Sequence, residues 1–357
     1  MPRSSSLLVV LVLAAGALTV LTVPHAPASS TPVPGRVVVA SANLHEGTLL
    51  AQRPDLADDT DLRRFAQRLA GLGAEAPDVV ALQEVRGSLG RVVSLLNRHA
   101  RDGATYAAVS RPGLSRQRGV CGDRAGRFTV VRDGALVVNT ATTTVLQRGS
   151  IRTWGRWSPA TRGLMRRADA GGCAEHPWAQ VRVVHEGASR DAVVVGTHVG
   201  PRGHHLKIRA MGRLADRARA VAGADDLLVL AGDFNLPWCH RGPGSPSGTC
   251  RTAKGHDALL ARGFGDALHA TDADRGPSLR VDFVHTSGKV VVAAWDRCYR
   301  PGLAPGCPRR DRVFRSQREY AACHRRAVAH GRPGPGCGPG AYARYYSDHP
   351  VVTATVR

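Results

Sequence analysis

Residues 227–235 read Leu-Leu-Val-Leu-Ala-Gly-Asp-Phe-Asn, and this stretch decides the fold. An apolar run ends in a polar turn, a pattern typical of a strand buried on both faces that stops at a sheet edge. Asp233 and Asn235 then lie at that edge, two residues apart and therefore on the same side if the chain is extended. We expect a buried strand that delivers an acid and an amide to the rim of a sheet.

Other polar fragments close runs that are rich in apolar residues in the same way. Asn43 follows residues 37–39, all valine, and His198 follows residues 193–195, also all valine. The remaining fragments are Gln83-Glu84, after Val-Val-Ala-Leu, and Ser-Asp-His at residues 347–349. We expect one site, assembled from several strand ends.

The residue types at these ends suit the hydrolysis of a phosphate ester, which requires charge neutralisation on the phosphoryl oxygens and an activated water. Glu84 and Asp348, with the amide oxygen of Asn43, offer hard oxygen ligands. So few carboxylates suit Mg²⁺ better than an enclosed Ca²⁺ cage. We therefore predict a Mg²⁺ site, with Mn²⁺ or Ca²⁺ as alternatives.

The remaining polar residues fit catalytic roles. His349 has an ordinary pKa near neutrality and is expected to take the proton from water, with Asp282 holding its tautomer. His198 is expected to donate a hydrogen bond to the phosphate or a proton to the leaving group. Asp233 and Asn235 are expected to orient water and phosphate.

These motifs resemble those of the endonuclease/exonuclease/phosphatase superfamily, which includes pancreatic-type deoxyribonuclease. The likeness spans residues 36–357 and rests on the fragments above together with Arg-Val-Asp-Phe-Val at residues 280–284. It implies a four-layer α/β sandwich, in which two mixed β-sheets pack face to face with helices outside. It also matches Asn43, Glu84 and Asp348 to metal-site residues and Asp282 with His349 to a catalytic pair. In the deoxyribonuclease branch the histidine that matches His198 has a carboxylate partner, for which Asp133 is the nearest acid here.

Local patterns predict further elements. Apolar spacing predicts a helix over residues 61–72 and another whose buried face includes Met211 and Leu214 and which Gly223 ends. Residues 135–138 and 142–146 favour strands, and residues 179–196 favour a hairpin that turns at Glu186-Gly187.

The N-terminal residues have the features of an export signal. Residues 7–23 are uncharged and apolar, preceded by Arg3 and followed by Ala-Pro-Ala at residues 26–28. We predict cleavage near Ala28 and secretion, with a membrane anchor as the alternative. Residues 29–35 are expected to be a linker, and residues 36–357 one domain that functions as a monomer.

Eight cysteines in the exported part fit an oxidising destination and permit four disulfides. Short-range closure favours Cys239–Cys250, Cys298–Cys307 and Cys323–Cys337. The paired Cys-x-x-Cys spacing of a zinc site does not occur in the sequence.

The formal net charge is +21, and residues 297–346 hold eleven arginines, two acids and four of the cysteines. We interpret this segment as a basic insertion that contacts the substrate or is a solvated surface. Together with export, it favours nucleic acid as the substrate, as in a nuclease. A phospholipid or sphingomyelin phosphodiesterase, or a phosphatase, is the second interpretation. In it Trp154 and Trp157 would form a pair for contact with an anionic lipid surface, but we prefer to interpret them as ordinary packing residues. A non-catalytic binding module is the third.

Overall fold

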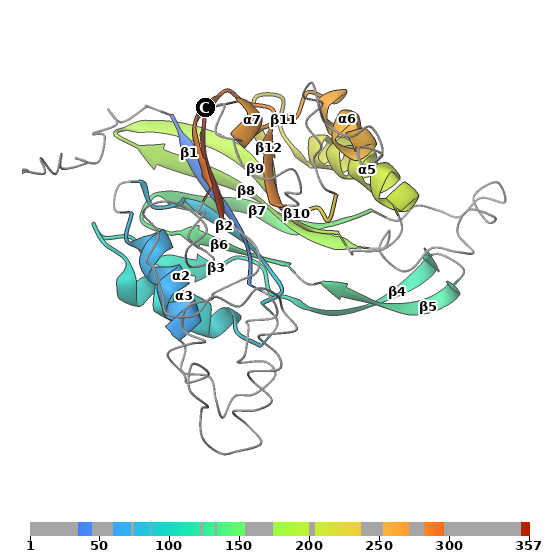
Figure 1. The fold of residues 1–357 in the computed structure, drawn as a ribbon, viewed down its shortest axis with the longest axis horizontal. Helices are drawn as coiled ribbons and strands as arrows, with labels where there is room; N and C mark the ends of the chain where they lie inside the picture. Colours follow the sequence, from blue (N-terminus) through green and yellow to red (C-terminus); the bar gives the residue numbers. More distant parts are fainter. Residues whose placement is uncertain are drawn as a thin grey trace, which may run out of the picture. The chain divides into compact units, whose positions relative to one another are not determined.

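Two six-stranded β-sheets form the centre of the computed structural model (Figure 1). The structure describes residues 35–44, 60–72, 75–85, 87–121, 124–132, 134–153, 174–199, 204–236, 253–270, 282–295 and 351–357. All of them belong to one unit, Pro34–Arg357.

The first sheet has the strand order β13-β14-β1-β2-β6-β3. Its strands are β1 (Val37–Asn43), β2 (Val79–Gln83), β3 (Tyr106–Ala108), β6 (Gly134–Asn139), β13 (Val290–Trp295) and β14 (Val352–Val356). β1 runs parallel to β2 and antiparallel to β14, so the chain enters β14 at the end of the sheet where β1 stops.

The second sheet has the order β11-β12-β10-β9-β8-β7. Its strands are β7 (Thr143–Arg152), β8 (Glu175–His185), β9 (Ala188–His198), β10 (Leu227–Asp233), β11 (Gly265–Asp266) and β12 (Asp282–Thr286). β9 and β10 are parallel, and β12 pairs antiparallel with β10. A separate ribbon consists of β4 (Gly113–Cys121) and β5 (Arg124–Arg132).

Helices cover the outer face of each sheet. α2 (Thr60–Ala70) and α3 (Leu89–His99) pack on the first sheet, and α5 (His204–Val221) and α6 (Ala253–Leu260) pack on the second (Figure 1). The short α7 (Ala267–Ala270) contacts β12 and β13 and contributes Ala267 and Leu268 to the core between the sheets. Valines such as Val39, Val79, Val194 and Val229 fill the space between the sheets. Strands β1, β2 and β10 are buried along their whole length, which explains their unbroken apolar runs. The predicted four-layer α/β sandwich is confirmed.

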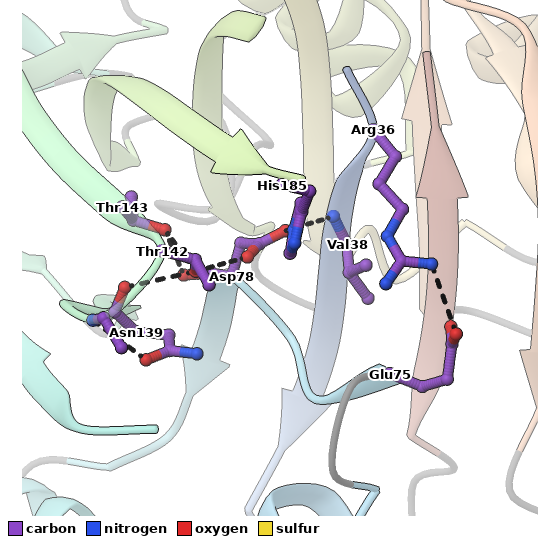
Figure 2. A network of polar contacts seen from close by, with 9 residues as sticks. Arg36, Val38, Glu75, Asp78, Asn139, Thr142, Thr143 and His185 are labelled. Carbon is purple, nitrogen blue, oxygen red and sulfur yellow. Dashed lines mark hydrogen bonds and ion pairs between the residues drawn. The ribbon is translucent and has the colours of Figure 1, made fainter. Parts of the chain in front are cut away.

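A buried carboxylate links the two sheets near Val38, at the start of β1. Asp78, fully buried, accepts hydrogen bonds from the Val38 amide (2.7 Å), the Thr142 hydroxyl (2.6 Å) and His185 Nε2 (3.0 Å). Figure 2 shows these contacts reaching β1 of the first sheet and the β8–β9 hairpin of the second. Because a buried carboxylate without donors is costly, this network fixes how the sheets align.

The sequence predicted most of these elements but not all. The helices at residues 61–72 and around Met211, the hairpin at Glu186-Gly187 and the buried strands are present. α3, α6 and the β4–β5 ribbon were not predicted. The signal peptide, the linker up to residue 34, the three cysteine pairs, residues 297–346, Asp133, Trp154, Trp157, Asp348 and His349 lie outside the described residues. In the described part of the chain, no helix is long and apolar enough to cross a membrane.

Candidate functional site

Four strand ends from both sheets meet at one place. β1 ends at Asn43 and β2 at Gln83, next to Glu84, while β9 ends at His198 and β10 at Asp233. Each pair of strands is parallel, so its carboxyl ends lie at the same edge. β1 faces β10 across the interior, which brings the two edges together.

Asn43 joins the two sheets through its side-chain amide. Its Nδ2 donates to Glu84 Oε1 and to Asp233 Oδ2, each at 3.1 Å. Asn43 and Asp233 are buried, and Glu84 is partly exposed. One neutral donor therefore holds two carboxylates from different sheets close together.

His198 lies beside the same carboxylates. Its Nε2 is 3.6 Å from Glu84 Oε1 and 3.8 Å from Asp233 Oδ2. One ligand atom from each of Glu84, His198 and Asp233 lies within 4.8 Å of the others. Two carboxylates and an imidazole at this spacing form a group that can hold a divalent metal ion.

Two site residues have strained backbones. Glu84 has φ 55° and Asn235 has φ 49°, in the left-handed region that non-glycine residues rarely adopt. The other two such residues in the described part of the chain, Asp102 and Glu186, each precede a glycine in a turn. Left-handed backbone in non-glycine residues concentrates at functional sites because the surrounding contacts must enforce it.

The turn at Asn235 corrects one expectation. Asp233 and Asn235 do share one side of the site, but the chain between them is not extended. Instead the backbone amide of Asn235 donates to Asp233 Oδ1 at 2.7 Å. The side-chain Nδ2 of Asn235 donates to Val199 O at 2.7 Å and to Asp233 Oδ2 at 3.1 Å. The turn fixes the Asp233 carboxylate on both oxygens.

Gly232 allows β9 and β10 to approach each other beside the site. A Cβ atom at this position would lie 1.8 Å from the carbonyl oxygen of Thr197, the residue before His198. Any side chain at residue 232 would therefore push the two site strands apart.

A buried imidazole pair supports the loop that carries Asn235, and no sequence motif indicated this pair. His256 Nε2 lies 2.9 Å from Leu236 O, and His256 Nδ1 lies 3.1 Å from His285 Nε2. Both rings pack with Phe234 and Phe283, the residues after Asp233 and Asp282. Because a carbonyl only accepts, His256 carries its proton on Nε2 and accepts at Nδ1 from His285.

Asp282 and His176 flank the site. Asp282 is fully buried and is the direct cross-strand partner of Asp233, so the two acids lie on the same face of the second sheet. His176, on β8, is also buried, and its burial, together with the charge of His198, lowers its pKa to about 3. His176 is therefore neutral at physiological pH. No sequence pattern distinguished it from other strand residues.

The family model for the endonuclease/exonuclease/phosphatase family matches residues 40–349. The chain belongs to this family. Its members are phosphoesterases, and the matched range includes every site residue that the sequence predicted. The structure brings together Asn43, Glu84, His198, Asp233 and Asn235 and places Asp282 opposite Asp233, while Asp348 and His349 lie outside the described residues.

Solved structures share the fold at low sequence identity. A family protein from Bacteroides thetaiotaomicron has 14% identity and a TM-score of 0.51, covering 91% of this chain and 98% of its own. A family protein from Bacteroides vulgatus has 14% identity and a TM-score of 0.50, covering 90% and 98%. D. rerio TDP2, complexed with single-strand DNA product, has 16% identity and a TM-score of 0.47, covering 90% and 99%. Among curated proteins, none is similar enough to this chain to count as a match.

Proposed function

We propose that this family member is a secreted, Mg²⁺-dependent enzyme that hydrolyses phosphodiester bonds in nucleic acid. The observation that carries the proposal is the convergence of Asn43, Glu84, His198 and Asp233 from four strand ends in two sheets. Two carboxylates this close attract a cation, and a cation bound there would in turn attract the anionic phosphodiester.

The donor set fits a hard divalent cation. Glu84 and Asp233 offer carboxylate oxygens, with Asn43 and His198 beside them, and Asp348 is the further ligand that the family resemblance implies. When bound, Mg²⁺ would neutralise charge on the phosphoryl oxygens as a Lewis acid.

The protein's own residues supply the remaining chemistry. In the proposed reaction, water attacks phosphorus while His349, oriented by Asp282, takes its proton. The ester P–O bond then breaks, and the leaving oxygen takes up a proton from His198 or solvent. Asn235 Nδ2 already donates to Val199 O at 2.7 Å and to Asp233 Oδ2 at 3.1 Å, so a hydrogen bond to a phosphate oxygen would replace the longer of these two bonds.

Charge supports nucleic acid as the substrate class. The chain has 49 basic residues against 28 acids, and residues 113–132, which include strands β4 and β5, contain five arginines and one aspartate. Such an excess attracts a polyanion, and binding to it weakens steeply with salt.

The test uses the purified exported chain with duplex DNA, RNA and sphingomyelin vesicles, each with Mg²⁺ and with chelator. We expect chelator-sensitive cleavage of DNA or RNA that weakens as salt rises. Glu84→Gln should reduce the rate by about 10²-fold or more, because it removes a charged ligand from the site.

Asp225→Asn is the matched control, since Asp225 is exposed and outside the site. Cleavage that persists in chelator, or a wild-type rate for Glu84→Gln, would contradict the proposal. Hydrolysis of sphingomyelin alone would assign the site to lipids instead.

A further inference from the structure

A pocket outside the candidate site is lined by α3, β3 and the chain that leads into β4. Its volume is about 610 Å³, within the usual range for small-molecule sites. The lining residues are Gly87, Leu89, Gly90, Val93, Ala107, Ala108, Arg111, Pro112 and Gly113.

The pocket lies toward the site end of the first sheet. Gly87 follows Glu84 by three residues. On the other wall, the amides of Val109 and Ser110 contact Leu136 O, so the chain continues beside β6. The first residue of β6, Gly134, pairs with Gln83, the neighbour of Glu84. Both walls of the pocket are therefore tied to the strand end that carries Glu84.

Two arginines give the pocket a positive charge. Arg111 lines it and is exposed, and a Cβ atom on Gly113 would lie 3.4 Å from Arg132 Nη2. Among the described residues, neither arginine forms an ion pair with an acid, and the buried Arg132 Nε has no hydrogen-bond partner. No carboxylate from the residues that the structure describes lines the pocket, so this lining suits an anion and not a metal ion.

The apolar character of the other lining residues indicates which class of anionic ligand fits. Leu89, Val93 and Pro112 are apolar, and within the described part of the chain Arg111 is the only polar side chain that lines the pocket. A sugar needs several hydrogen-bond partners, which these side chains do not provide. A flat, largely apolar ring beside a phosphate does match, because apolar surfaces and guanidinium planes both pack on nucleobases.

We propose that this pocket binds a nucleotide next to the scissile phosphodiester, with the base against the apolar wall and its phosphate at Arg111 and Arg132. The assignment rests on the proposed function and refines it, since it gives the enzyme a base-binding subsite. It implies contact with an unpaired or extruded base, because a stacked base inside a duplex cannot enter a pocket.

Two substitutions test the pocket from opposite sides. Ala107→Trp fills it from an exposed position, and Arg111→Gln removes the cation. The control is Arg101→Gln, an exposed arginine that does not line the pocket. The first measurement is binding of a fluorescent single-stranded oligothymidylate in chelator, followed by anisotropy, so that catalysis plays no part.

We expect Ala107→Trp to weaken binding about tenfold and Arg111→Gln about fivefold, the scale of one lost base or phosphate contact, with Arg101→Gln close to wild type. With Mg²⁺, the ratio of kcat/KM for oligothymidylate to kcat/KM for bis(4-nitrophenyl) phosphate should fall by the same factors. The small diester has no nucleotide, so its hydrolysis does not depend on the pocket. Circular dichroism confirms that each variant is folded.

Wild-type affinity in both pocket variants would overturn the subsite and leave the proposed function standing. If wild-type protein hydrolyses neither compound, the proposed function fails, while the binding data still decide the pocket. Variants that lose hydrolysis of sphingomyelin vesicles but bind oligothymidylate normally would show that the pocket holds a lipid.

Discussion

Gly232, Glu84 and Asn235 show how single residues set the geometry of the site. Gly232 permits close approach of β9 and β10, and Glu84 and Asn235, which both have left-handed backbones, contact Asn43 and Asp233 with their side chains. At these three positions the backbone conformation or close contact is locally unfavourable, as expected where function constrains the backbone.

Replacing Gly232 by Ala should damage the site directly. The added methyl group would meet the Thr197 carbonyl at 1.8 Å, so His198 and Asp233 must move apart. We expect a loss of about 1–3 kcal/mol in unfolding free energy, as for overpacking, and a fall in kcat of about tenfold or more. Chemical denaturation and turnover measure the two effects.

Gly265→Ala is the control, because nothing lies within 4 Å of a Cβ added there. Equal stability and turnover for Gly232→Ala and Gly265→Ala would contradict this role of Gly232.

At the scale of residues, the sequence predicted which residues lie at the candidate site but not their backbone conformations. Asn43, Glu84, His198 and Asp233 could be picked out because each closes an apolar run, a local signal. The conformation of Asn235 could not, because its left-handed turn depends on Val199, which lies 36 residues away in the chain.

At the scale of elements, α6 and β12 support the loop that carries Asn235 through the His256–His285 pair. Gly255 helps α6 to dock, since a Cβ there would lie 2.5 Å from Leu236 Cδ1. The His256–Leu236 bond then holds the residue directly after Asn235. These histidines hold the loop after β10 in place from the side of α6 and β12.

Two substitutions of His256 separate positioning from simple packing. Gln places its amide nitrogen near the position of Nε2 and can still donate to Leu236 O, whereas Asn mimics Nδ1 and cannot. We expect His256→Asn to lower kcat about tenfold with little change in KM, and His256→Gln to retain most activity. Steady-state kinetics on bis(4-nitrophenyl) phosphate measure kcat and KM separately. Equal kcat in both variants would contradict a positioning role.

His176 on β8 should make stability depend on pH. Its pKa is lowered to about 3, so between the ordinary value of 6.5 and about 3 the unfolded chain binds a proton that the folded chain does not. Folding stability is therefore lost as pH falls through this window, by up to about 1.4 kcal/mol per pH unit.

His176→Gln removes the titrating group. In denaturant titrations at pH 7 and pH 5 with chelator, the variant should lose less stability than wild type on acidification. Identical losses would contradict the burial of a neutral His176.

The elements that the sequence failed to predict have weak local signals. α3 contains Gly90 and adjacent valines, which lower helix propensity, and it is stabilised by packing Leu95 and Leu96 into the core under α2 and the first sheet. α6 spans only eight residues and includes Gly255. The β4–β5 strands are rich in glycine and arginine and show no clear alternation.

At the scale of the whole molecule, the site depends on how the two sheets align. Asn43 connects them at one end of β1, and Asp78 connects them at the other through Val38 and His185 (Figure 2). The sandwich was predictable because the polar motifs at the strand ends resemble those of a family with this fold. The register between the sheets was not, since it depends on contacts between residues far apart in the sequence.

Asp78→Asn should destabilise the fold while leaving the chemistry intact. The Asn amide cannot accept at both former oxygen positions, so the Val38 amide or the Thr142 hydroxyl loses its acceptor. We expect a loss of about 2–4 kcal/mol in unfolding free energy with kcat within about twofold of wild type at low temperature. Thermal denaturation and turnover at about 10–15 °C, near the temperature of maximum stability, measure both. A kcat loss as large as that of Glu84→Gln would contradict a purely structural role for Asp78.

The central claim is that Glu84 from the first sheet and Asp233 from the second act in one phosphodiesterase site. A double-mutant cycle on kcat/KM for bis(4-nitrophenyl) phosphate, with Glu84→Gln, Asp233→Asn and the double variant, tests it most directly. Residues that act as a unit give strongly non-additive losses, so the double variant should be little slower than the worse single variant. Losses that multiply, or wild-type rates in either single variant, would contradict a shared site.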